Sequence, residues 1–178
     1  MTATSIKVLA AAAVMMLSSA VNALVITDVD NPFQFLSEGE SHTVYHDLTD
    51  DGVPDEYMVN SARLRLAFSD GYLLPDWSYD VADISSDGVS GLFEVDGTHV
   101  FGFDVRWLTV GQDGIDTLNA YGVLAVTVTA VDMPGGHNDF WWKKSKLIAH
   151  VTEVPAPATL LLLGLGLCGV HFGRRSRR

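Results

Sequence analysis

An acidic stretch near residue 50 has the spacing of side chains that a calcium loop requires. The candidate ligands, which recur at every second position, are Asp47, Thr49, Asp51, Val53 and Asp55. Alternate residues of such a loop point inward around a small hard cation, and a glycine at the sixth position, here Gly52, allows the sharp turn. Met58 stands at the twelfth position, where a bidentate glutamate is preferred. We therefore expect either a Ca2+ site or a purely structural acidic turn.

No combination of residues in the sequence points to catalysis. His42 and His46 are expected on a strand about 13 Å apart, too far to share a metal ion. Ser90 lacks the spacing and the strand-to-helix setting of a nucleophile elbow. Asp and Glu are so numerous that they single out no glycosidase pair. The sequence therefore predicts no catalytic residues and a protein that is not an enzyme, with a small envelope hydrolase as an alternative.

The elements that must position these residues are expected to be short β-strands. Apolar and polar residues alternate in three segments, as in a strand with one buried face. The predicted inward residues are Ala62, Leu64, Leu66 and Phe68; Phe101, Phe103, Val105 and Trp107; and Leu124, Val126, Val128 and Ala130. Asp-Gly pairs, typical of tight hairpin turns, begin at residues 51, 70, 87, 96 and 113. Without any sustained helical stripe, the pattern predicts one antiparallel β-sandwich or jelly-roll domain.

The predicted domain, residues 24–153, is strongly acidic. All 22 Asp and Glu of the chain lie within it, against six Lys and Arg, which gives a net charge of −16. Such a surface repels nucleic acid, so nucleic-acid binding is excluded as a function. The one cysteine, Cys168, lies outside this range, so the domain must fold without a disulfide.

The first 23 residues have the layout of a secretory signal peptide. One basic residue, Lys7, precedes an apolar run, and small residues end the segment at Ala23. We expect signal peptidase to cut after Ala23 and the domain to be exported.

The last 25 residues, 154–178, consist of a proline-containing hinge, an apolar run and a basic terminus. The hinge is Val154, Pro155, Ala156, Pro157, Ala158 and Thr159. The apolar segment Leu160–Gly173 predicts a transmembrane helix, and the basic stop is formed by Arg174, Arg175, Arg177 and Arg178. Because basic residues stay cytoplasmic, the domain would lie on the outer side of the inner membrane.

This tail resembles the PEP-CTERM sorting signal of Gram-negative bacteria, in which a Val-Pro-Glu-Pro-Ala-Thr motif precedes an apolar helix and an arginine cluster. Ala156 stands where the family prefers glutamate. The resemblance implies processing by an exosortase, a membrane protease-transpeptidase, and a mature form at the cell surface or in an exopolysaccharide or biofilm matrix. The segments 46–52, 59–64 and 139–147 also resemble domains found ahead of that signal, which are expected to be β-sandwiches without established catalysis.

Aromatic residues give one further alternative. Trp141 and Trp142 are adjacent, so on a strand they face opposite ways and one is expected outside the core. Exposed aromatic rings, with Trp77 and Tyr79 as further candidates, are how β-sandwich modules stack on sugars. We therefore expect an exported, exosortase-processed surface or matrix protein. The alternative function is a calcium-dependent carbohydrate-binding or adhesive module.

Overall fold

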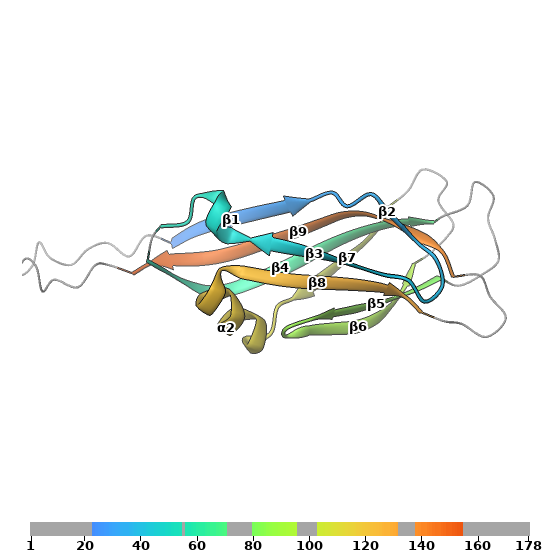
Figure 1. Ribbon diagram of the computed structural model, residues 1–178. Helices are drawn as coiled ribbons and strands as arrows, with labels where there is room; N and C mark the ends of the chain where they lie inside the picture. Colours follow the sequence, from blue (N-terminus) through green and yellow to red (C-terminus); the bar gives the residue numbers. More distant parts are fainter. Residues whose placement is uncertain (1–22, 55, 71–79, 96–102, 132–137, 155–178) are drawn as a thin grey trace, which may run out of the picture. The chain divides into compact units, whose positions relative to one another are not determined.

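The computed structural model describes residues 23–54, 56–70, 80–95, 103–131 and 138–154. Within them, Ala23–Thr152 form one compact unit. Nearly every element of this unit is a strand of one of two antiparallel sheets, which face each other as two layers (Figure 1). The predicted β-sandwich class is therefore confirmed.

The first sheet contains β1 (Ala23–Asp30), β2 (Gln34–Leu36), β4 (Tyr57–Asp70), β7 (Asp104–Thr109) and β9 (Phe140–Glu153). Its strand order is β1-β9-β4-β7, and β2 continues the edge that β1 begins, since both strands pair with β9. Strands that are distant in sequence are thus neighbours in space, as in the pairing of the first strand with the last.

The second sheet contains β3 (Ser41–Asp47), β5 (Asp80–Ser86), β6 (Val89–Val95) and β8 (Val123–Ala130), in the order β3-β8-β5-β6. Strands β5 and β6 form a hairpin in which Ser86 pairs with Val89 across Asp87-Gly88. Gly88 has a φ of 68°, a left-handed conformation that glycine adopts without strain. This confirms one of the predicted Asp-Gly turns.

The core lies between the sheets and is built from alternating residues of the long central strands. On β4 the alternating buried residues are Ala62, Leu64, Leu66 and Phe68, and Val59 and Ala67 are buried as well; on β8 they are Leu124, Val126, Val128 and Ala130. Strand β9 adds Phe140 and Trp142, and the Phe140 ring meets Phe68 edge-on with centroids 5.5 Å apart. Both predicted alternations are therefore confirmed for these two strands.

The prediction for the strand that ends near Trp107 was wrong. Trp107 and Phe103 are exposed by 53% and 62%, so this apolar face points outward. The opposite face carries Asp104 and Arg106, which pair in register with the buried Phe68 and Leu66. Arg106 donates to the backbone oxygen of Glu94 on β6 at 2.6 Å. Because β7 is an edge strand, its inward positions lie at the rim of the core, where charged side chains can be satisfied.

A helix that the sequence pattern did not reveal, α2 (Gln112–Tyr121), connects β7 to β8. It contains the Asp113-Gly114 pair, so the predicted hairpin turn at this pair is wrong. Gly111 donates to the backbone oxygen of Gly88 at 2.9 Å, and a Cβ on Gly114 would collide with the backbone oxygen of Asp87. The close approach of α2 to the β5–β6 hairpin therefore requires glycine, although glycine has a low helix propensity.

Candidate functional site

The acidic loop of the predicted calcium site folds into the short 3-10 helix η1 (Leu48–Asp51). Asp47 caps this helix: its Oδ1 accepts hydrogen bonds from the backbone nitrogen of Thr49 at 2.8 Å and from Thr49 Oγ1 at 2.6 Å. Gly52 follows with a φ of 79° and ends the helix in the left-handed conformation. Two of the five candidate ligands therefore already bond to each other.

The carboxylates of this loop repel one another. The hydrogen bonds from Thr49 hold the pKa of Asp47 below its usual value. Partial desolvation, together with the charges of Asp28, Asp50 and Asp47, raises the pKa of Asp51. Among the described residues, no group of three or more His, Cys, Asp and Glu is placed to hold a metal ion. Val53 lies in the loop after η1, and Asp55 lies outside the described residues, so the calcium site stays a prediction.

A buried polar array joins the two sheets at their β1–β3 side. His46 on β3 donates from Nδ1 to Asp28 Oδ2 at 2.8 Å, and its Nε2 shares a 2.7 Å hydrogen bond with Ser145 Oγ on β9. These are the residue types and contacts of a serine-hydrolase triad. However, His46 and Ser145 are both 0% exposed, so a substrate cannot reach the hydroxyl. The array satisfies polar groups within the sandwich and links its layers.

The sorting motif begins where the sandwich ends. Strand β9 stops at Glu153, and Val154, the first motif residue, is exposed. The other motif residues, the apolar run and the arginine stop lie outside the described residues, as does nearly all of the predicted signal peptide. Ala23 is the first residue of β1 and pairs with Thr152. No helix in the described ranges is long and apolar enough to cross a membrane.

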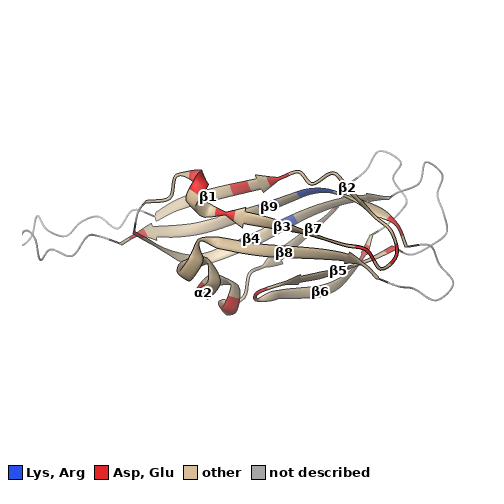
Figure 2. Ribbon diagram, viewed as in Figure 1, with Lys and Arg blue, Asp and Glu red and all other residues tan. Residues whose placement is uncertain are grey.

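The outer face of the first sheet gathers the basic residues of this acidic domain. The strands of the second sheet contain no Lys or Arg, whereas all six of the domain lie on β4, β7 and β9. The blue segments that are visible in Figure 2 lie on strands of the first sheet. Arg106 lies on the inward side of β7 and pairs with Asp104, whereas the other five are exposed or half-exposed: Arg63, Arg65, Lys143, Lys144 and Lys146. Among the acidic residues of these strands, Asp104 lies on the inward side of β7, and Glu153 is exposed at the last position of β9. A net charge of −16 therefore coexists with one local cationic face.

Aromatic rings lie among these cations. Arg65 pairs in register with Trp107, and its guanidinium carbon lies 5.9 Å from the centroid of the indole ring. Lys143 Nζ lies 4.2 Å from the centroid of Trp141 and 5.6 Å from that of Phe33. Both distances fall in the range of cation–π attraction. As predicted for the adjacent tryptophans, Trp142 is buried and Trp141 remains partly exposed on the outside.

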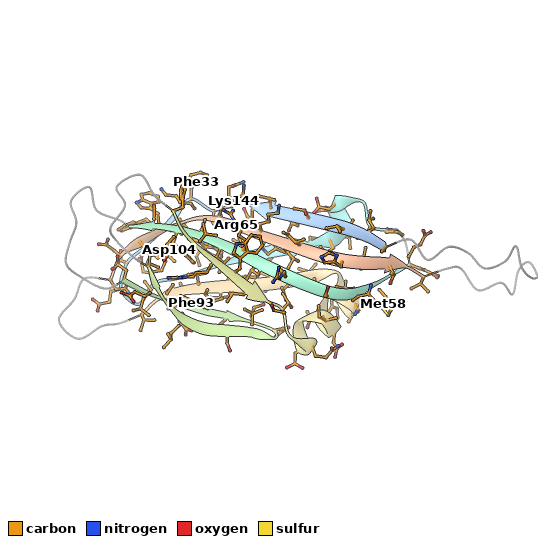
Figure 3. The ribbon with its side chains drawn as sticks, turned by 180° about the vertical axis from the view of Figure 1, so that it is seen from behind. Phe33, Met58, Arg65, Phe93, Asp104 and Lys144 are labelled. Carbon is orange, nitrogen blue, oxygen red and sulfur yellow. The ribbon has the colours of Figure 1, made fainter. Side chains whose placement is uncertain are left out.

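The segment between β1 and β2 forms a bulge opposite β9, beside a groove on this face. Asn31, Pro32 and Phe33 stand opposite only two residues of β9, Lys143 and Lys144, and Phe33 has a φ of 45°. The irregular pairing turns both lysines away from the core. The outer-face groove has a volume of about 270 Å3, and its lining consists of Asn31, Phe33, Arg65, Ala67, Phe103, Lys143 and Lys144. Figure 3 shows Phe33, Lys144 and Arg65 gathered at the same end of the sheet.

The sequence did not reveal this groove. Its lining comes from β4, β9 and the segments before β2 and β7, which become neighbours only through long-range strand pairing. The sequence signal for it is the alternation of Phe103, Val105 and Trp107, which predicts a buried face although Phe103 and Trp107 are exposed. Trp77 and Tyr79, the other candidates for exposed rings, lie outside the described residues.

The structure thus defines a two-layered antiparallel β-sandwich, and a C-terminal signal follows it in the sequence. Residues 153–178 match the family model of the PEP-CTERM protein-sorting motif, which confirms the resemblance of the tail. The chain therefore carries a PEP-CTERM sorting signal. Such a signal implies an exported protein that is anchored at the membrane before an exosortase processes it.

Comparisons of the sandwich show only a general likeness of fold. The CBM36-1 domain of a multidomain xylanase from the hindgut metagenome of Trinervitermes trinervoides aligns with a TM-score of 0.41 and 11% identity, covering 71% of this chain and 96% of that domain. Dimeric latent PorU from Porphyromonas gingivalis gives a TM-score of 0.45 and 8% identity, covering 76% of this chain but only 13% of PorU. FlhE gives 0.38 and 12%, covering 72% and 96%. No curated protein matches the sequence.

Proposed function

We propose that this chain is a non-enzymatic β-sandwich that is exported, processed by an exosortase at its C-terminal signal, and then displayed at the cell surface or released into an exopolysaccharide or biofilm matrix. The observation that carries the proposal is the sorting motif at residues 153–178. Signal peptidase would first remove residues 1–23, and the precursor would remain in the inner membrane through the segment Leu160–Gly173.

The ends of the sandwich are compatible with cleavage at both sites. The compact unit ends at Thr152 and β9 ends at Glu153, one residue before the motif. Cleavage within the motif would therefore remove no described strand and no described core residue. Likewise, a cut after Ala23 costs the sandwich only the terminal pair between Ala23 and Thr152. Processing at both ends is compatible with an intact fold.

Cell fractionation of a strain that lacks its exosortase tests this proposal. We expect the full-length precursor to accumulate in the membrane fraction of the mutant, while the parent strain yields a shorter form outside the inner membrane. An equal distribution of one product in both strains would refute exosortase processing. A cytoplasmic product in the parent strain would refute export.

The proposal that the sandwich is not an enzyme can be tested at Ser145, the residue with the most hydrolase-like contacts. Because Ser145 is fully buried, we expect no covalent labelling of the folded protein by a fluorophosphonate. A serine that lies in an open active site reacts with such probes. Labelling at Ser145 in the native state, abolished in Ser145→Ala, would instead favour the envelope-hydrolase alternative.

The second candidate function is a calcium-dependent carbohydrate-binding or adhesive module at the acidic loop. Desolvation by burial raises the pKa of Asp51, and the charges of Asp28, Asp50 and Asp47 raise it further; a divalent cation bound there would offset this repulsion. Melting of the protein with and without calcium separates the two candidates. An increase in melting temperature with calcium that is lost in Asp51→Asn would support the module, and no change would remove it.

A further inference from the structure

The outer-face groove has the composition of a binding site for an anionic ligand. We propose that it binds an acidic polysaccharide, with sugar carboxylates held by Arg65, Lys143 and Lys144 and sugar rings placed against Phe33 and Phe103. This inference rests on the proposed function for the presence of a polysaccharide around the exported protein. It adds the charge class of the polymer and the residues that bind it.

The lining of the groove is positively charged. Three of the seven residues that line the groove are cationic and none is acidic. Among the described residues, Arg65, Lys143 and Lys144 form no ion pair, whereas Arg106 is paired with Asp104 at 2.9 Å. Unpaired cations that cluster in a domain of net charge −16 create a local attraction for anions on a molecule that otherwise repels them. The cationic character is therefore specific to this face.

Aromatic rings hold two of the groove's cations in place. Lys143 lies over the Trp141 ring and near Phe33, and Arg65 lies near Trp107, so ring contacts limit the conformations of both side chains. A preorganised cation loses less conformational entropy when a ligand binds. The guanidinium group can also form two parallel hydrogen bonds to one carboxylate. A planar sugar carboxylate matches this donor arrangement.

Exposed aromatic rings lie beside these donors. Phe33 and Phe103 are each exposed by 62%, although leaving a phenyl ring in water is unfavourable. Aromatic rings pack against the apolar C–H face of a sugar, whereas a simple inorganic anion gains nothing from them. The pairing of cations with exposed rings therefore indicates a ligand with both a charged group and an apolar face.

Size and compartment narrow the choice of ligand. The groove volume of about 270 Å3 lies just below the usual range of small-molecule sites, which suits one unit of a chain. Double-stranded nucleic acid is disfavoured by the net negative charge of the domain. An exported protein meets acidic polysaccharides in an extracellular matrix, so we choose these over acidic peptides, which carry no ring-stacking face on their carboxylate side chains.

Binding of the full-length protein, purified in a mild detergent, to alginate tests the inference. Alginate, a polymer of uronic acids, is compared with the neutral polymer dextran at equal chain length, in the presence of EDTA. We expect binding to alginate that weakens as the salt concentration rises, and no binding to dextran at the same concentrations. Equal binding to both polymers, or a requirement for calcium, would overturn the proposal.

Substitutions locate the site. We expect the double variant Arg65→Ala/Lys144→Ala to weaken alginate binding by about tenfold or more, and Phe33→Ala by about threefold. Two matched controls should stay within about twofold of the parent protein: Arg63→Ala removes the same charge on the same face outside the groove, and Tyr45→Ala removes an exposed ring from the second sheet. An equal loss in Arg63→Ala would show that binding depends only on diffuse charge.

Two further arms keep the test decisive. Polyglutamate and double-stranded DNA are titrated in parallel, and binding to either as tight as alginate binding, with the same loss in the double variant, would overturn the choice of a sugar ligand. If the double variant fails to fold, Arg65→Gln and Lys144→Gln are measured singly, with unchanged unfolding midpoints required. These measurements do not depend on processing, so their failure would leave the exosortase proposal intact.

Discussion

His46 on β3 and Ser145 on β9 share a hydrogen bond of 2.7 Å, although 99 positions separate them in the sequence. The two residues belong to different sheets, and both are fully buried. Asp28 on β1 completes the array through His46 Nδ1, so three strands meet at one imidazole ring. The array therefore links the two layers with polar contacts at a place where a β-sandwich normally has apolar side chains.

We predict that His46→Ala destabilises the domain by about 2 to 4 kcal/mol. The substitution leaves a cavity and removes the hydrogen-bonding partner of the buried Ser145 hydroxyl. Urea unfolding followed by tryptophan fluorescence measures the difference. His150→Ala is the matched control, because His150 is exposed on β9, the strand that carries Ser145. We expect this variant to change stability by less than about 0.5 kcal/mol. Equal effects of both variants would contradict a stabilising role for the array.

Gly114→Ala should destabilise the protein, although alanine favours a helix over glycine by about 1 kcal/mol. The added Cβ would collide with the backbone oxygen of Asp87 and with Val110, so α2 would have to move away from the β5–β6 hairpin. We expect a loss of about 1 to 3 kcal/mol in urea unfolding. The control, Ala120→Gly at an exposed position of the same helix, reports propensity alone. A gain in stability for Gly114→Ala would show that this close contact is not required.

The stability that Asp47 contributes should depend on pH. Because Thr49 lowers the pKa of Asp47 in the folded state, the contribution is complete above the unfolded value of about 3.9 and is lost as the pH falls through the folded value. Asp47→Ala should therefore cost about 0.5 to 1 kcal/mol at neutral pH and less at pH values below about 3. Unfolding at several pH values checks this, with Asp50→Ala as the control. A cost that does not fall in acid would contradict the assignment.

The sequence alone predicted the central strands because their alternation has a strong energetic cause. Leu64, Leu66, Val126 and Val128 are buried on one face, and a register slip of one residue would expose them all. The helix α2 escaped prediction because its start carries glycines that serve a contact between elements. Such a contact cannot be read from the local pattern.

The outer-face groove could not be predicted for a related reason. The alternation ending at Trp107 identifies an apolar face correctly but does not say which side of the sheet that face occupies. At an edge strand, the side that faces the core depends on contacts with other strands. Here Arg106 faces inward because its side chain donates to a backbone oxygen of β6. The proximity of Arg65 to Lys144 likewise follows from the order of β9, β4 and β7, which short-range sequence patterns do not encode.

Ala156→Glu should increase the rate of processing at the sorting signal. The substitution introduces the glutamate that PEP-CTERM signals prefer between the two prolines. It thus supplies a charged group that the exosortase can recognise. Pulse-labelling of the precursor and its product in the native host measures the rate. Ala156→Gln is the matched control, since it adds similar volume without charge. An unchanged rate in both variants would show that Ala156 does not limit processing.

The central claim is that the C-terminal segment is removed from an exported protein, and the intact mass of the protein recovered from outside the cell tests it most directly. We predict a product that begins at Leu24, contains the whole sandwich through Glu153, and lacks Leu160–Gly173 and the arginines that follow. Any additional mass would identify a group attached during processing. A recovered protein that still ends in Arg178 would contradict the claim.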